Sequence, residues 1–96
     1  MMDYNDIVVA KKKITTEREA DLSTLEQIAQ QKGYYKGMGT NGENGFGLYI
    51  DFFYIDSRDP PFENHLREKV KEILGTSYEG IPIYVRFGNM PEASDR

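Results

Sequence analysis

Five side chains that are suited to binding recur at alternate positions in two segments of this sequence. They are Tyr49, Asp51 and Phe53 in the first segment, and Tyr84 and Arg86 in the second. Alternate residues of a β-strand point to the same side, so each set shares one face of a predicted strand. Tyrosine and arginine are enriched among the residues that dominate protein interfaces, and an aspartate–arginine pair fixes orientation. The pattern therefore predicts a binding surface.

The strand that carries the first set, residues 45–55, is apolar on its other face as well. That second face is made by the even-numbered residues Phe46, Leu48, Ile50, Phe52 and Tyr54. A small domain with one sheet covers only one face with its own helices, so the other face must meet a partner, a ligand or a second copy. We expect Tyr35, from a neighbouring strand, to join this outer face. Two alternatives remain: a terminal tail covers the outer face, or the face assignment is inverted.

The strands and helices that would position these side chains are predicted from hydrophobic periodicity and from turn residues. We expect strands at 6–14, 34–40, 45–55 and 81–87, and helices at 17–32 and 62–74. This β-α-β-β-α-β order predicts an α+β, ferredoxin-like split βαβ fold, with two helices on one face of an antiparallel sheet. The triple lysine at 11–13 would also suit a helix, in which case residues 6–14 are helical and the sheet has three strands.

Length and composition limit the classes of function. The 96 residues predict a single domain over 1–96, with an ordered core at about 6–88 and frayed tails. A net charge of −4 argues against general binding to phosphate backbones. The chain has no cysteine, which excludes disulfides and cysteine zinc sites. We expect no metal, no cofactor, no membrane association and a cytoplasmic location.

An enzymatic or small-molecule site is the second class of function. Asp51, Asp56 and the single histidine, His65, would form it near the end of the predicted hairpin. One histidine cannot build a multi-histidine metal centre, and these spacings match no dedicated catalytic or calcium-binding motif. We therefore expect a protein that is not an enzyme.

Two short resemblances to known families add further expectations. Gly45-Phe46-Gly47 resembles part of the first ribonucleoprotein signature of RNA-recognition motifs. The resemblance implies a third class of function, the binding of single-stranded RNA whose bases stack on the sheet. In that family a basic residue precedes these three, whereas this chain has Asn44. The C-terminal half resembles small prokaryotic or phage α+β domains of unclear function, which implies such a source. Its matching segments are Gly37-Met38-Gly39, Leu48-Tyr49-Ile50 and Gly80-Ile81-Pro82-Ile83-Tyr84-Val85.

The sequence as a whole favours a small, non-enzymatic binding or regulatory protein, such as a phage or mobile-element inhibitor or adaptor. Its partner would be a protein, first of all a second copy of itself, because most oligomers are symmetric homo-oligomers. Nucleic acid is an unfavoured partner for an acidic chain. The expected contact residues are Tyr49, Phe53, Tyr84, Arg86, Tyr35 and Asp51.

Overall fold

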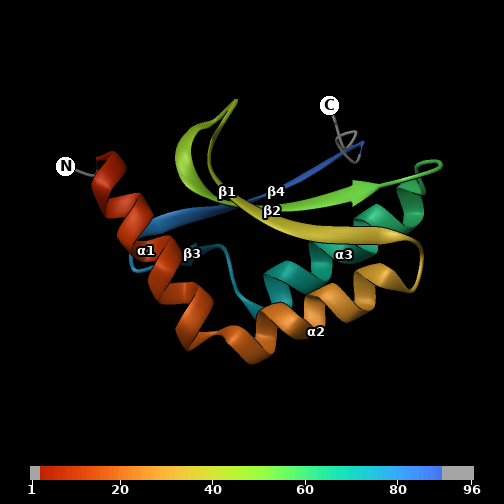
Figure 1. Ribbon diagram of the computed structural model, residues 1–96, viewed down its shortest axis with the longest axis horizontal. Coiled ribbons are helices and arrows are strands. Elements are labelled where there is room, and N and C mark those ends of the chain that lie inside the picture. The colour runs from red at the N-terminus through yellow and green to blue at the C-terminus, as the bar shows by residue number, and fades with distance from the viewer. Residues whose placement is uncertain (1–2, 90–96) are drawn as a thin grey trace, which may run out of the picture.

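A computed structural model describes residues 3–89, which form three helices and a four-stranded mixed sheet in ααββαββ order (Figure 1). The elements are α1 (Tyr4–Glu17), α2 (Glu19–Gln30), β1 (Tyr34–Gly42), β2 (Gly45–Tyr54), α3 (Pro60–Ile73), β3 (Ser77–Tyr78) and β4 (Ile81–Asn89). The α+β class is confirmed. The predicted ferredoxin-like β-α-β-β-α-β arrangement is wrong, because a third helix precedes the two that were expected and the sheet is mixed and not antiparallel. Of the two tails expected to fray, residues 1–2 and 90–96 lie outside the described residues, whereas residues 3–5 form the capped start of α1.

The first difference is at residues 6–14, which belong to helix α1 and not to a strand. Ile7, Ala10 and Ile14 are buried, and their spacing of three and four residues is that of one helical face. Asp3 and Asp6 cap the N-terminus reciprocally through their side chains and backbone N–H groups. The cap and the helical spacing outweigh the β-propensity of the branched residues.

A second difference is the break between α1 and α2 at Arg18, where one helix was expected over 17–32. Arg18 leaves the helical conformation, with φ −115° and ψ 30°. Its guanidinium donates to the Ile73 carbonyl at the end of α3, at 2.6 Å, and pairs with Asp21 at 2.7 Å. These contacts hold the corner between the two helices against the end of the third.

The strand order is β1-β2-β4-β3, and it explains why the sheet is mixed. The β1–β2 hairpin is antiparallel, whereas β4 runs parallel to β2. Parallel neighbours need a long crossover connection, which α3 provides between β2 and β4. The short strand β3 forms a tight hairpin with the start of β4 through two residue pairs.

The core lies between the sheet and the three helices, all of which cover the same face (Figure 1). Ile50 and Phe52 are buried against α2 and α3, and Leu48 is buried against α1. Ile83 and Val85 join the same side from β4. The predicted inner face is therefore confirmed, and Tyr49, Asp51 and their neighbours face the other way.

A buried polar network fixes the connection from the sheet to α3. The fully buried Tyr34 donates its hydroxyl to Glu63 at 2.7 Å and accepts from the Asp59 N–H at 2.8 Å. Arg58 pairs with both oxygens of Glu63, at 2.6 and 3.1 Å. Asp59 then caps α3 by accepting from the Phe62 N–H.

None of the helices within residues 3–89 is long and apolar enough to cross a membrane.

Candidate functional site

The six predicted contact residues lie in adjacent rows across the outer face of the sheet. Tyr49 of β2 lies beside Tyr84 of β4, and Asp51 lies beside Arg86. On the other side of β2, Phe53 lies beside Tyr35 of β1. Period-two alternation and the parallel register of β2 and β4 thus bring all six onto one surface. Their role as partner-binding residues stays a prediction.

Arg86 reaches across β2 and connects three elements of this face. Its guanidinium binds both carboxylate oxygens of Asp51, at 2.6 and 3.0 Å. It also lies 4.2 Å from the centroid of the Tyr49 ring and donates to the Asn41 carbonyl at 2.9 Å. The Asp51 hydrogen bonds raise the pKa of Arg86, so this side chain is a permanent cation. Arg86 therefore ties the tip of the β1–β2 hairpin to the middle of the sheet.

Glycines in β1 make room for this arrangement. A Cβ at Gly39 would lie 2.7 Å from the Arg86 guanidinium, and one at Gly42 would lie 2.6 Å from both Arg86 and the Tyr49 ring. The register also shifts between Gly39 and Asn41, and such a bulge increases the local bend of a strand. The hairpin tip accordingly bends away from α2 and α3 in Figure 1.

Tyr49 is consequently fully buried, although it lies on the face without helices. Its hydroxyl donates to the Gly45 carbonyl at 2.8 Å and accepts from the Asn44 N–H at 3.1 Å. Its ring packs 4.9 Å from that of Tyr84. The bent hairpin and Arg86 cover this tyrosine, whereas the sequence suggested a terminal tail as the cover. The glycines of β1 that lie opposite Tyr49 and Arg86, Gly39 and Gly42, are the sequence signal for this bend, and the sequence analysis did not use them.

The accessible part of the outer face is centred on Phe53. The ring of Phe53 lies over Gly37, where a Cβ would approach it to 3.1 Å. On the other side, nothing lies within 4 Å of a Cβ built at Gly88. A hollow of about 180 Å³ opens there, lined by Asp51, Phe53, Arg86, Phe87 and Gly88. Phe53 and Tyr84 are half-buried, and Tyr35 is 40% exposed, so aromatic surface surrounds a charged pair.

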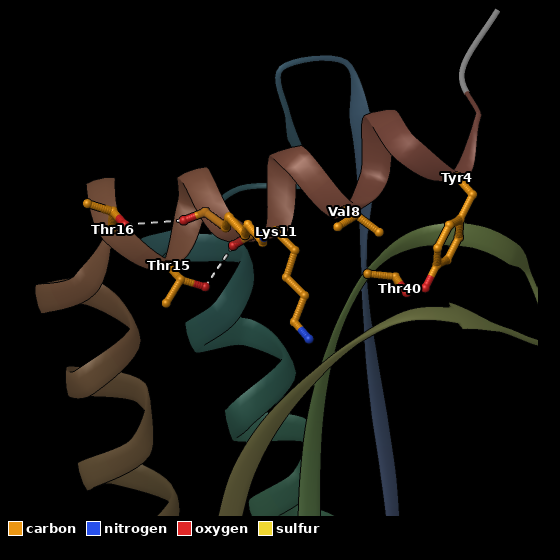
Figure 2. A pocket seen from close by; sticks show the side chains of 7 residues that line it. Tyr4, Val8, Lys11, Thr15, Thr16 and Thr40 are labelled. Carbon is orange, nitrogen blue, oxygen red and sulfur yellow. Dashed lines mark hydrogen bonds between the residues drawn. The ribbon is translucent and has the colours of Figure 1, made fainter.

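A second, larger concavity lies between α1 and β1, with a volume of about 440 Å³. Figure 2 shows Tyr4 and Thr40 at one end of it and the ammonium group of Lys11 extending toward the strands. Its lining residues are Tyr4, Val8, Lys11, Lys12, Thr15, Thr16 and Thr40. Both of its charged side chains are lysines, so this groove suits an anionic group.

Internal bonds occupy part of the groove's hydrogen-bonding capacity. The Thr15 and Thr16 hydroxyls donate to the carbonyls of Lys11 and Lys12, at 2.7 and 3.2 Å, as the dashed lines in Figure 2 mark. The half-buried Lys11 and the exposed Lys12, both on one side of an open groove, provide little fixed geometry for a ligand. The groove is therefore a weaker candidate than the outer face, where the polar groups are held rigidly.

The residues of the enzymatic alternative lie apart. Asp51 is on the outer face, paired with Arg86, whereas His65 is exposed on α3, which covers the inner face. Asp56 is exposed and lines a separate hollow of about 220 Å³ beside Gly33. Among residues 3–89, no group of three histidines or carboxylates is placed to hold a metal ion. Among the described residues, Asp51 and Asp56 thus line different hollows, and His65 lines neither of the two.

The segment that resembles an RNA-recognition signature also differs in its orientation. Phe46 lies on the helix side of β2, where its ring packs 5.6 Å from that of Tyr4 in α1. Bases stack on the open face of the sheet in RNA-recognition motifs. Phe46 is 44% exposed but faces α1, so it cannot act as that stacking residue in this conformation.

Comparison with known proteins gives no match: no family model, no curated protein and no solved structure matches this chain significantly.

Proposed function

We propose that this chain is a small, non-enzymatic binding protein that takes a protein partner on the outer face of its sheet. Phe53, Tyr84 and Tyr35 make the apolar contacts in this proposal. Tyr49, Asp51 and Arg86 contribute mainly by supporting these aromatic side chains, because their mutual contacts fix the structure of the outer face. A regulatory or adaptor role follows from binding without catalysis.

The observation that carries the proposal is the hollow between Phe53 and Arg86. Its volume of about 180 Å³ is below the roughly 300–1,000 Å³ of pockets that enclose small-molecule ligands, so it suits a single protruding side chain. An aromatic wall beside a fixed ion pair combines apolar burial with directional contacts, as at the centre of protein interfaces. An apolar or aromatic side chain of a partner would stack on Phe53.

Site-specific photo-crosslinking in the source cell tests this proposal. Phe53 is replaced by a benzophenone-bearing phenylalanine analogue, which keeps the aromatic ring in the hollow. The matched control carries the same analogue at Val9, which is 63% exposed on α1 and far from the outer face in the fold. We expect a discrete protein adduct from position 53 and none from position 9.

Competition separates specific binding from chance contact. An excess of the unlabelled wild-type chain should suppress the adduct, whereas the Phe53→Asp variant should not. Absence of an adduct, or equal adducts from both positions, refutes the proposal. An adduct that a nuclease removes would favour the RNA alternative.

A further inference from the structure

Strand β1 forms an open edge of the sheet. In the order β1-β2-β4-β3, it pairs with β2 on one side and has no neighbouring strand on the other within residues 3–89. Successive backbone groups of a strand point alternately to its two sides, so half of those in β1 point away from β2. Among the described residues, no helix or loop backbone bonds to residues 35–40. Residues 34–39 also keep a regular register with β2, so this edge presents an ordered row of donors and acceptors.

A groove follows this edge on the helix side of the sheet. Its strand wall is made by Lys36, Met38 and Thr40, which alternate along β1. Its other wall follows one helical stripe of α1 and continues onto α2. The hollow of about 440 Å³ in Figure 2 and a second one of about 310 Å³ meet at Thr15, which lines both. A strand added beside β1 would therefore direct alternate side chains into this groove.

The charged side chains of the groove are unevenly distributed along it. Lys11 and Lys12 line the larger hollow, which has no acidic side chain in its lining. Glu19 and Glu26 of α2 line the smaller hollow, together with Lys36. None of these five side chains forms a salt bridge within residues 3–89. The α1 end of the groove is therefore basic in a chain whose net charge is −4, and it complements a carboxylate.

An open strand edge beside a basic groove favours an extended peptide as the occupant. The two lysines alone fix little geometry, but the backbone of β1 supplies it for a peptide that binds by strand addition. A small anion would use the lysines and leave the edge unpaired. A second copy of β1 fits poorly, because its one charged residue, Lys36, would meet Lys11 and Lys12 with the same sign of charge. Antiparallel pairing is the more stable per residue, so the peptide runs from Thr40 toward Lys36.

We propose that an extended segment of a partner protein binds along β1 as an added antiparallel strand. An acidic side chain of this segment lies beside Thr40 and pairs with Lys11 and Lys12. The side chain two residues later is apolar and covers Met38, which is half-buried. This site is separate from the outer face of the sheet, and Val9, the crosslinking control for that face, lines neither hollow of the groove.

Titration with a defined peptide, followed by NMR of the isotope-labelled chain, tests this site. The probe is a capped seven-residue peptide of threonine, a strand-forming residue, with glutamate at its third position and valine at its fifth. Up to about 1 mM peptide, we expect the amide signals of residues 35–40 to shift and their hydrogen exchange to slow. No change in these residues, or changes confined to α1, overturns the proposal.

Charge reversal tests the role of the two lysines. The double variant Lys11→Glu/Lys12→Glu should bind the glutamate peptide about tenfold more weakly, because like charges then face each other. Replacing the peptide glutamate by lysine should restore binding to this variant. The matched control Lys69→Glu/Lys71→Glu makes the same change in net charge on α3, whose residues line neither hollow, and should bind as the wild type does. Equal weakening in both double variants contradicts the assigned contact.

N-methylated peptides separate strand pairing from an ion pair alone, and they leave the protein unchanged. One peptide carries methyl groups on its odd-numbered amides and the other on its even-numbered amides. Only alternate amides of an added strand face β1, so one peptide should lose binding and the other should keep it. Acetylglutamate amide, which supplies the anion without the strand, should bind at least about tenfold more weakly than the full peptide. Equal behaviour of the two methylated peptides, or equal affinity of acetylglutamate amide, refutes strand addition.

Discussion

The hydroxyl of Tyr34 is the most informative single group for stability. It lies in a fully buried side chain, donates to Glu63 at 2.7 Å and accepts from the Asp59 N–H at 2.8 Å. Tyr34→Phe deletes this hydroxyl and keeps the ring, which packs between Tyr54 and Phe62. The substitution therefore isolates the polar contribution of the network from its packing.

The expected loss follows from the two contacts that disappear. A hydrogen bond to a charged group contributes about 1.5–3 kcal/mol, and a donor left without its partner adds to the cost. Because Glu63 keeps Arg58, we expect the free energy of unfolding to fall by about 2–4 kcal/mol. A chain of this length has a total stability of roughly 5–14 kcal/mol, so the loss is large and the variant still folds.

Urea denaturation followed by circular dichroism measures this loss. Tyr54→Phe is the matched control, because Tyr54 is only half-buried and no hydrogen bond of its hydroxyl is found among the described residues. We expect this control to change stability by less than about 0.5 kcal/mol, as for most surface substitutions. A loss below about 1 kcal/mol for Tyr34→Phe would refute the reasoning, because it falls short of one charged hydrogen bond.

Alkaline pH provides an independent check on the same hydroxyl. Burial, and then the hydrogen bond to Glu63, raise the pKa of Tyr34 from 10.0 to about 12. A raised pKa means stability that is complete below pH 10 and falls as the pH rises to 12, by about 2.7 kcal/mol for two units. Tyr34→Phe lacks this ionisation, so the stability gap between wild type and variant should shrink over that interval. A constant gap would contradict the assignment.

Four further substitutions, one of them a matched control, test the outer face and the helix cap by the same denaturation assay. Arg86→Met should lower stability by about 2–3 kcal/mol, because it leaves the 7%-exposed Asp51 without its cation. This loss is smaller than that of a fully buried ion pair, because the arginine side chain is 36% exposed. An unchanged stability would exclude a structural role for Arg86. Gly42→Ala should cost about 1–3 kcal/mol by overpacking against the hairpin, whereas Gly88→Ala, with open space around it, should change little; equal effects would contradict the bent hairpin. Asp59→Ala should cost about 1 kcal/mol through loss of the α3 cap, and an unchanged midpoint would show that the cap contributes nothing.

Local patterns in the sequence were sufficient for most elements of the second half. Residues 45–55 are apolar on both faces of a strand and residues 81–87 are rich in branched and aromatic side chains, and the observed strands follow these two segments closely. The helix expected at 62–74 is observed at Pro60–Ile73. The favoured strand at 6–14 is wrong, because branched residues favour strands while the deciding cap begins at Asp3, before the segment considered; the helical alternative for these residues is confirmed.

Pairing between distant strands was beyond the sequence reasoning, and so was the shape of the candidate site. Nothing in the residues of β4 specifies that it runs parallel to β2; the crossover through α3 and the β3 hairpin decides this. Alternation correctly grouped Tyr49 with Tyr84 and Asp51 with Arg86. It could not show that Tyr49 is buried, because that depends on how far the β1–β2 hairpin bends.

The contact from Arg86 to the hairpin tip also orders the events of folding. The β1–β2 hairpin closes through neighbours in the sequence, which is a fast and local process. Arg86 is 45 residues from Asn41 and reaches it only after α3 has carried β4 into place beside β2. Until then Tyr49 lacks its cover, and the tip has no anchor. A chain still emerging from the ribosome, or one cut before β4, therefore lacks the arginine that covers its central tyrosine, and the mature surface needs β4 in place.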